Sequence, residues 1–248
     1  MKVLVSGCNG KMGQEVAKEV RLAQDMDVIC GVDRIDTGDN CFPVFTKVSD
    51  IEVIPDVIID FSVPQATFAM LDFAKKNQVP IVIATTGFSE SEMKKIEKYA
   101  ENLPIFKSAN MSYEINLMAK IVSELALKLE HSDIEIIETH HHRKIDSPSG
   151  TALILADSIN EALEHEMKYE YDRHSKREKR AKNEIGIHSI RGGTEVGKHS
   201  VIFFGENESF EITHNCTSRS VFARGAIKAA EFILHKENGL YSMNDLLK

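Results

Sequence analysis

Short apolar runs alternate with longer segments of helical periodicity through the first half of the chain. The apolar runs are rich in Val and Ile and lie at 3–6, 28–33, 56–61, 79–84 and 104–107. Continuous runs of this kind are typical of strands that are buried on both faces of a parallel sheet. Helical patterns lie between them at 11–23, 64–76 and 89–100. This alternation predicts an α/β domain with a doubly wound parallel sheet.

The second half of the chain has a different pattern. Helical periodicity marks 115–130, 151–163 and 221–234, and strand-like runs lie at 134–138, 185–190, 199–204 and 209–216. Consecutive strands of this kind predict an antiparallel or mixed sheet. We therefore expect two unequal domains, and we expect the last helix to return to the first of them.

Composition and charge narrow the class of protein. The 248 residues are 42% hydrophobic and 27% charged, which excludes global disorder. A formal net charge of −8 argues against nucleic acid as a partner. The four cysteines form no C-x-x-C pair and no zinc-like spacing, so we expect reduced thiols and a cytoplasmic location. No secretory signal and no apolar run of ~18 residues is visible, which predicts a soluble protein with no membrane partner.

A glycine-rich turn follows the first predicted strand and opens the first predicted helix. Its glycines are Gly7, Gly10 and Gly13, a spacing that allows a tight turn, close approach of the backbone to a pyrophosphate, and free N–H groups at a helix N-terminus. Asp33 ends the second predicted strand, 20 residues beyond Gly13, where an acid that binds the ribose is expected. The combination predicts a dinucleotide site. Asp33 favours NADH, whereas the adjacent Arg34 favours the 2′-phosphate of NADPH. The sequence is therefore compatible with the use of either cofactor.

The densest group of reactive side chains lies at 138–152. Three histidines at 140–142 precede Lys144 and a turn-forming Ser-Pro-Ser-Gly. Histidine acts as an acid or a base near neutral pH, and a partly desolvated lysine is a cation and a proton donor. Gly150 and Thr151 follow the turn and begin a helix, so their N–H groups can bind a carboxylate. The segment predicts acid–base chemistry on an anionic substrate.

Two points about this segment stay open at the level of sequence. Strict strand alternation puts His140 and His141 on opposite faces, so the strand must end by about Thr139 if both histidines reach the ligand. A zinc site made by His140, His142 and Asp146 is the weaker alternative, because no second cluster supplies further ligands.

A basic run at 173–182 contains six cations and one acid, Glu178. The first interpretation is a solvated surface segment. The second is a positive rim that attracts an anionic ligand.

With these motifs the chain resembles the 4-hydroxy-tetrahydrodipicolinate reductase (dihydrodipicolinate reductase) family nearly from end to end. The segment 140–151 is similar to the family's H-H-x-x-K-x-D-x-P-S-G-T, its most diagnostic motif. The other matching segments are Gly7-x-x-Gly10-Lys11-Met12-Gly13, Asp60-Phe61-Ser62-x-Pro64, Thr85-Thr86-Gly87, Ser108-Ala109-Asn110-Met111-Ser112, Arg191-Gly192-Gly193, Gly197-x-His199, Glu211-Ile212-Thr213-His214 and Ser218-Arg219.

The resemblance implies a fold and a reaction. The fold is a Rossmann-like parallel-sheet domain that binds the dinucleotide, at 1–111 and 219–248, and a smaller α+β domain with a mixed sheet at 112–218. The second domain is implied to bind substrate and to build a homotetramer. The reaction is reduction of a small cyclic dicarboxylate, 4-hydroxy-tetrahydrodipicolinate, by NADH or NADPH with loss of water, in lysine and diaminopimelate biosynthesis. No metal is expected.

The resemblance also implies functions for individual residues. His140 and Lys144 are the implied acid–base pair, with Lys144 as the proton donor to the ring. The implied carboxylate-binding residues are His141, Gly150, Thr151 and Arg219. The implied cofactor-binding residues are Gly7, Cys8, Asn9, Gly10, Lys11, Met12, Asp33, Arg34, Ala84, Thr85, Thr86, Ser108, Ala109, Asn110 and Met111.

Two positions depart from the family pattern. Ala84 replaces the first glycine of G-T-T-G, and its methyl group can crowd the nicotinamide half of the cofactor site. Glu114 stands where the family often has glycine, which matters if the position needs a positive φ. Two other classes of function stay open: another Rossmann-type dehydrogenase of a small carboxylate, and a non-catalytic NAD(H)-binding sensor.

Overall fold

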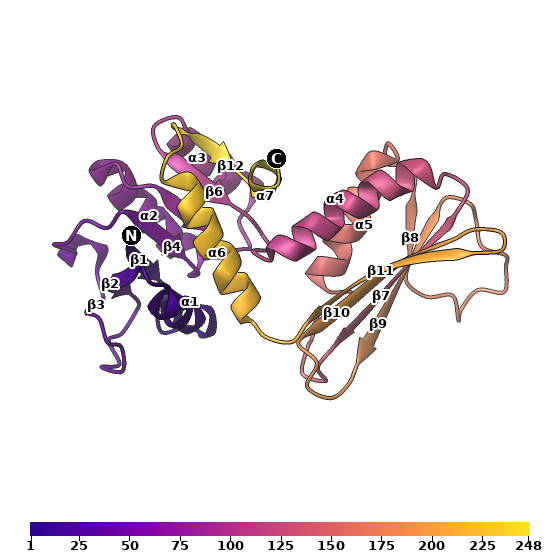
Figure 1. Ribbon diagram of the computed structural model, residues 1–248, viewed down its shortest axis with the longest axis horizontal. Helices are drawn as coiled ribbons and strands as arrows, with labels where there is room; N and C mark the ends of the chain where they lie inside the picture. The colour runs from indigo at the N-terminus through magenta and orange to yellow at the C-terminus, as the bar shows by residue number, and fades with distance from the viewer. The chain divides into compact units, whose positions relative to one another are not determined.

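The chain forms two compact units, seen in the computed structural model, which describes residues 1–248 (Figure 1). One unit combines Met1–Tyr113 with Arg219–Lys248, and the other is Glu114–Ser218. No helix in the chain is both long enough and apolar enough to cross a membrane.

The first unit is built on a seven-stranded sheet in the order β12-β6-β5-β4-β1-β2-β3. Every neighbouring pair in this sheet is parallel. The strands are β1 (Lys2–Ser6), β2 (Asp27–Val32), β3 (Val44–Phe45), β4 (Val57–Asp60), β5 (Ile81–Ile83), β6 (Pro104–Lys107) and β12 (Gly239–Tyr241). The predicted α/β class is therefore confirmed.

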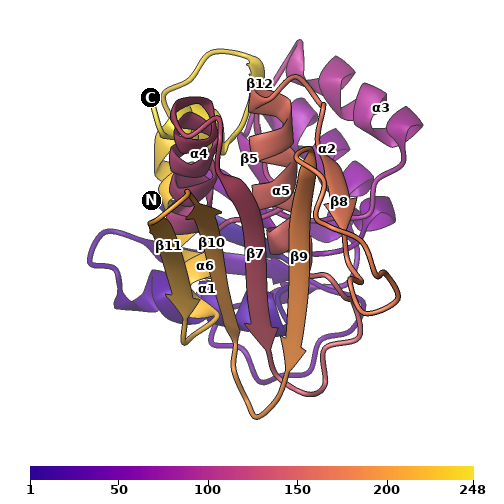
Figure 2. The same ribbon diagram turned by 90° about the vertical axis from the view of Figure 1, so that its right-hand side faces the viewer.

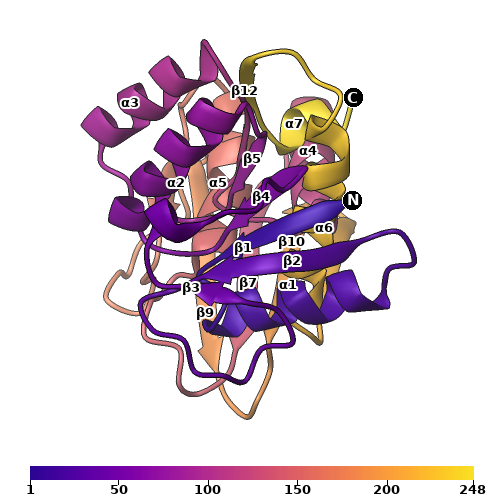
Figure 3. The ribbon, with the colours of Figure 1, turned by 90° about the vertical axis from the view of Figure 1, so that its left-hand side faces the viewer.

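Helices cover both faces of this sheet, which is why most residues of its strands are apolar (Figure 3). On one face, Val3 and Val5 share a core with α1 (Lys11–Leu22) and α6 (Ser220–Ile233). On the other face, Leu4 shares a core with α2 (Pro64–Asn77) and α3 (Glu90–Ala100). Short elements complete the unit, namely the 3-10 helix η1 (Val48–Asp50) and α7 (Met243–Leu246).

The second unit is built on a mixed sheet in the order β11-β10-β7-β9-β8. β7 is parallel to β9 and antiparallel to β10. Figure 2 shows this sheet with α4 and α5 behind it. The elements are α4 (Tyr113–Lys128), β7 (Asp133–His140), α5 (Gly150–Ala162), β8 (Lys168–Glu170), β9 (Glu184–Arg191), β10 (Gly197–Phe204) and β11 (Ser209–Cys216).

The two faces of the second sheet differ. Ile134, Ile136 and Val201 pack under α4 and α5 in the core. Because side chains alternate along a strand, the residues between them lie on the opposite, open face. Its large apolar side chains include Ile190, which is 51% exposed, and Phe204, which is 42% exposed.

The observed elements depart from the predicted ones mainly in the shortest pieces. Strands β3, β8 and β12 have only two or three residues, too few to show a hydrophobic period. β7 runs two residues beyond the predicted end at 138, because His140 is paired with Arg191 of β9.

Candidate functional site

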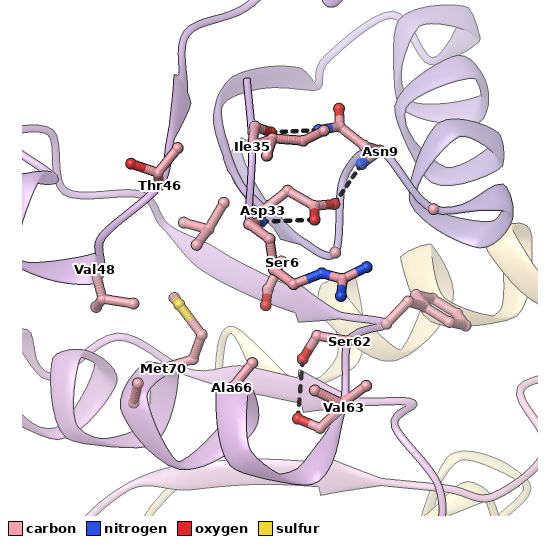
Figure 4. A pocket seen from close by; sticks show the side chains of 16 residues that line it. Ser6, Asn9, Asp33, Ile35, Thr46, Val48, Ser62, Val63, Ala66 and Met70 are labelled. Atoms are coloured by element: carbon pink, nitrogen blue, oxygen red, sulfur yellow. Dashed lines mark hydrogen bonds between the residues drawn. The ribbon is translucent and has the colours of Figure 1, made fainter. Parts of the chain in front are cut away.

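A cavity of about 890 Å³ lies in the first unit, where β1 and β4 end. These strands are neighbours in the sheet, but the helices that follow them lie on opposite faces. Such a reversal opens a crevice at the carboxyl ends of the strands, the usual ligand position in this architecture. The lining residues are Ser6, Gly7, Asn9, Gly10, Val32, Asp33, Arg34, Ile35, Thr46, Val48, Phe61, Ser62, Val63, Ala66, Ala69 and Met70 (Figure 4).

Two glycines permit the turn between β1 and α1. Gly7 has φ +77, and a Cβ there would lie 2.5 Å from the carbonyl oxygen of Phe61. A Cβ on Gly13 would lie 2.2 Å from the carbonyl oxygen of Gly7. Gly10 is the N-cap of α1 and offers no side-chain hydrogen bond. The N–H groups at the start of α1 are therefore not capped by that residue, as a phosphate-binding turn requires.

Asp33 lies directly after β2 and faces the glycine turn (Figure 4). Its carboxylate accepts the backbone N–H of Asn9 at 2.8 Å and that of Arg34 at 2.7 Å. Each oxygen can accept a second hydrogen bond, so the carboxylate can still bind a ribose hydroxyl. The side chain of Asn9 donates to Ile35 O at 2.7 Å and fixes the turn to the loop after β2.

The cavity brings together five of the predicted cofactor residues: Gly7, Asn9, Gly10, Asp33 and Arg34. The other predicted positions lie outside its lining. They are Cys8 in the glycine turn, Lys11 and Met12 at the start of α1, Ala84–Thr86 after β5, and Ser108–Met111 after β6. The methyl group of Ala84 belongs to the hydrophobic core of the unit. Packing in this core therefore explains why alanine occupies position 84.

A buried carboxylate that sequence reasoning did not assign organises the ends of β4 and β5. Asp60 has no exposed surface. It accepts hydrogen bonds from the hydroxyl groups of Ser62 at 2.6 Å, Thr67 at 2.5 Å and Thr85 at 2.9 Å. The Ser62 N–H in turn donates to Thr85 Oγ1 at 3.0 Å. These bonds join the wall of the cavity to the predicted cofactor segment after β5.

The candidate catalytic segment lies at the end of β7 in the second unit. Glu138 and His140 both point to the helix-covered side of the sheet and are buried. His140 Nδ1 donates to Glu138 Oε2 at 2.5 Å. Arg191 donates from both terminal nitrogens to the same carboxylate, each at 2.7 Å. Burial opposes the charge on Glu138, but hydrogen bonds from Arg191, Ser189 and His140 outweigh it and lower the pKa of Glu138 to about 2.

Lys144 lies in the loop between β7 and α5. Its Nζ forms an ion pair with Asp146 Oδ2 at 2.8 Å, and its side chain is 20% exposed. The hydrogen bond from Lys144 lowers the pKa of Asp146. Arg191 also donates to the backbone carbonyl of Asp146 at 2.7 Å. The loop that carries Lys144 is therefore connected to the residues that surround His140.

The N-terminus of α5 completes this group. Ser149 is its N-cap and accepts the backbone N–H of Ala152 at 3.2 Å. The Ser149 N–H donates to Glu138 Oε1 at 3.1 Å. A Cβ on Gly150 would meet no atom within 4 Å, so open space lies beside the start of the helix. Gly150 and Thr151 are thus in the position where helix N–H groups bind an anion.

His199 of β10 supports the same helix start. Its Nε2 shares a hydrogen bond of 3.0 Å with Ser149 Oγ, and its ring packs edge-on against that of His140 at 5.1 Å. Its Nδ1 is buried without a hydrogen-bond partner. Burial lowers the pKa of His199 to about 3, and the neighbouring His140 adds to this shift.

The remaining residues of the predicted site are His141, His142 and Arg219, for which the structure gives other hydrogen-bond partners or another place in the chain. His141 N donates to Glu195 O at 2.8 Å. His142 Nδ1 donates to Gly193 O at 2.9 Å. Arg219 belongs to the first unit, as the residue before α6. No group of three or more potential ligand residues in the chain is arranged to hold a metal ion, so nothing in the structure favours the zinc alternative.

Three cations of the basic run form ion pairs with acids of the second unit. Arg173 pairs with Glu184 at 2.7 Å, and Lys176 pairs with Glu170. Arg180 pairs with Asp133 at 2.8 Å and with Glu135 at 3.1 Å. These pairs favour the interpretation as a structural surface segment over that of a free positive rim.

Glu114 lies in the first turn of α4. It is helical and is absent from the residues with positive φ, so glycine is not required at this position. A carboxylate in the first turn of a helix is favourable because it faces the positive end of the helix dipole.

The fold and the two groups of residues define a dinucleotide-dependent oxidoreductase. Its first 111 residues match the family model "Dihydrodipicolinate reductase, N-terminus", and residues 114–247 match "Dihydrodipicolinate reductase, C-terminus". The chain belongs to the dihydrodipicolinate reductase family. The predicted reaction is thereby confirmed: reduction of 4-hydroxy-tetrahydrodipicolinate with NADH or NADPH, in lysine and diaminopimelate biosynthesis.

Individual relatives agree with this assignment. The 4-hydroxy-tetrahydrodipicolinate reductase of Caldanaerobacter subterraneus subsp. tengcongensis is 48% identical over 248 residues, covering 100% of this chain and 98% of the relative. That of Clostridium novyi is 43% identical, with the same coverage. The structure of dipicolinate-bound dihydrodipicolinate reductase from Paenisporosarcina sp. TG-14 is similar with a TM-score of 0.83, at 28% identity and 98% coverage of both chains.

The buried His199 predicts that acid destabilises the fold. Histidine in an unfolded chain has a pKa of about 6.5, whereas the pKa of folded His199 is about 3. Between these values the unfolded chain binds more protons, so the free energy of unfolding falls as pH is lowered through this range. We expect His199→Gln to lose less stability than the unmodified protein between about pH 7 and pH 5. Urea unfolding at each pH measures this difference.

The exposed His174 in the same unit provides the control. His174→Gln should retain the pH dependence of the unmodified protein. Equal pH dependence in His199→Gln and the unmodified protein would contradict the interpretation.

Proposed function

We propose that His140 and Lys144 are the acid–base pair of this reductase, and that Lys144 is the proton donor to the substrate ring. The observation that carries this proposal is the linked arrangement around Glu138, in which one buried carboxylate contacts His140 and the start of α5. Lys144 lies on the loop that joins these two points. Its Nζ is held by Asp146 and its side chain is partly exposed, so Lys144 is accessible to a substrate.

The start of α5 is proposed to bind a carboxylate of the substrate. The N–H groups of Gly150 and Thr151 belong to the first turn of the helix, and the helix dipole favours an anion there. Ser149 fixes the helix start through its bonds to Glu138 and His199. His141 and Arg219 are proposed as further carboxylate-binding residues on the basis of the family motif.

The residues of the first unit fit a dinucleotide. Gly7 and Gly13 permit the tight turn before α1, where a Cβ would collide with the backbone, and Asp33 has lone pairs available for a ribose hydroxyl. Bound NADH or NADPH supplies the hydride. The remaining predicted residues, in the segments 8–12, 84–86 and 108–111, are proposed to contact the cofactor from the ends of neighbouring strands. Asp60 holds one of these segments through Thr85.

Replacement of the acid–base pair should affect turnover and leave cofactor binding intact. We expect His140→Ala and Lys144→Ala each to lower kcat by about 10²- to 10⁴-fold, the usual contribution of a positioned acid or base. The dissociation constant for NADH should stay within about twofold, because the dinucleotide residues lie in the other unit. Steady-state kinetics and a fluorescence titration with NADH measure the two quantities.

His142→Ala is the matched control, because His142 lies in the same segment and its Nδ1 bonds to a backbone carbonyl. It should turn over nearly as the unmodified enzyme does. Near-normal kcat in both the His140 and Lys144 variants would refute the assigned functions.

Use of both cofactors is proposed from the adjacent Asp33 and Arg34, which both line the cavity. A guanidinium can bind a 2′-phosphate, and a hydrogen bond to a charged group contributes about 1.5–3 kcal/mol. We therefore expect Arg34→Ala to raise KM for NADPH by about tenfold or more and to leave KM for NADH nearly unchanged. Kinetics with each cofactor test this, with NADH as the internal control. An unchanged KM for NADPH would remove Arg34 from this function.

We further propose a homotetramer in which the open face of the second sheet is an interface. Ile190 and Phe204 are exposed on that face, and an exposed apolar sheet face is typical of an interaction surface. Identical chains can bury such a face symmetrically.

A cytoplasmic location is also proposed, since all four cysteines are free thiols, as is usual in a reducing compartment.

A charge on the open face should disrupt the assembly. We expect Phe204→Glu to elute as a smaller species than the unmodified tetramer in size-exclusion chromatography with light scattering. Leu22→Glu, at an exposed apolar residue of the first unit, is the control and should leave the assembly unchanged. An unmodified protein that is monomeric, or a Phe204→Glu variant that remains tetrameric, would contradict this interface.

A further inference from the structure

The carboxylate of Glu138 is fully buried and accepts four N–H groups. Oε2 accepts from Arg191 Nη1 and from His140 Nδ1, and Oε1 accepts from Arg191 Nη2 and from the backbone N–H of Ser149. Together with the hydrogen bond from the Ser189 side chain, these four bonds leave little acceptor capacity unused. This arrangement requires the ionised carboxylate, because a protonated oxygen would itself be a donor.

The arrangement determines which nitrogen of His140 is available for chemistry. An ionised carboxylate can only accept, so the proton of its short bond to His140 lies on Nδ1. Nε2 is then the nitrogen that can exchange a proton with a ligand. A Cβ on Gly197 would lie 3.1 Å from that Nε2, so the glycine of β10 leaves room beside it.

Arg191 connects the same carboxylate to the segment that carries Lys144. Its Nη2 donates to the backbone carbonyl of Asp146 at 2.7 Å. The carboxylate of Asp146 holds Lys144 Nζ at 2.8 Å. A single guanidinium thus contacts Glu138 and fixes the backbone of the residue that pairs with Lys144.

We propose that Glu138 and Arg191 are positioning residues for the reaction. Glu138 sets the tautomer and orientation of His140, and Arg191 holds both Glu138 and the loop that carries Lys144. The inference rests on the proposed functions of His140 and Lys144.

An amide cannot replace this carboxylate without losing hydrogen bonds to at least one of its partners. In Glu138→Gln, one side of the amide is an NH₂ group, which faces N–H donors whichever way the amide is turned. If the NH₂ group faces His140, Nδ1 must become an acceptor and the proton must move to Nε2. If it is turned to the other side, it faces Ser149 N and Arg191 instead.

The second unit contains a matched cluster that has no link to the candidate catalytic residues. Glu135, three residues earlier on β7, pairs with Arg180 at 3.1 Å and with His188 at 2.7 Å. It therefore has an arginine and a histidine as partners, as Glu138 does, but alternation puts it on the opposite face of the strand. Glu135→Gln is the control for loss of a charged partner in this sheet.

A double-mutant cycle between Glu138 and His140 tests the proposal. We expect Glu138→Gln alone to lower kcat by roughly 10- to 100-fold, part of the contribution that a positioned acid or base makes. KM for the substrate and the dissociation constant for NADH should change by less than about threefold. In the His140→Ala background the same change should lower kcat by less than about threefold, because groups that act as a unit are not additive. Glu135→Gln should leave kcat unchanged.

The outcomes separate this proposal from the proposed function. If His140→Ala lowers kcat and Glu138→Gln does not, the positioning proposal fails alone. If Glu138→Gln lowers kcat equally with and without His140, Glu138 does not act through His140, and the proposal also fails. A normal kcat in His140→Ala would refute the acid–base assignment itself. If Glu138→Gln does not fold, Arg191→Lys takes its place in the cycle, because lysine keeps the charge but loses the two parallel hydrogen bonds.

Discussion

The ionised carboxylate of Glu138 is a constraint on which the second unit's candidate site depends. A carboxylate without solvent contact is unfavourable unless its charge is compensated, and here Arg191, His140 and Ser149 compensate it. Removing one partner of a buried ion pair typically costs about 3–5 kcal/mol. The partners come from β7, β9 and the start of α5, so these three elements must meet in one arrangement. The geometry of His140 and of the helix N-terminus follows from that requirement.

Net charge gives little information about such sites. The chain carries −8 overall, yet its substrate and its cofactor are both anionic. At the proposed sites the positive potential is local: two helix N-termini, those of α1 and α5, each follow a loop with glycine at the helix start. Lys144 and Arg34 add side-chain charge. In contrast, three cations of the basic run at 173–182 are neutralised by acids of the second unit, so the most basic segment of the sequence is a poor guide to the site.

Features that depend on local spacing could be predicted from the sequence. The glycine turn, Asp33 and the helix start at Gly150 each lie within a strand–turn–helix unit or at its end, and apolar runs located the longer strands. The cavity wall could not be predicted in the same way, since Val48 and Met70 have no motif and meet only through the folded sheet. Likewise Glu138 and Arg191 are 53 residues apart. Only the parallel pairing of β7 with β9 brings them together, and no pattern in the sequence specifies that register.

The two units use the same physical device to hold their functional loops. Asp60 ends β4 and Glu138 lies near the end of β7, and both are carboxylates with no exposed surface. Asp60 is surrounded by three hydroxyl donors, whereas Glu138 has a guanidinium and an imidazole among its donors. Hydroxyl groups can turn to follow a loop that adjusts to a cofactor, but a guanidinium with two parallel bonds fixes direction as well as distance. The more rigid device therefore lies beside the histidine that is proposed to keep one tautomer, and the more adaptable one lies beside the cavity that is proposed to bind the dinucleotide.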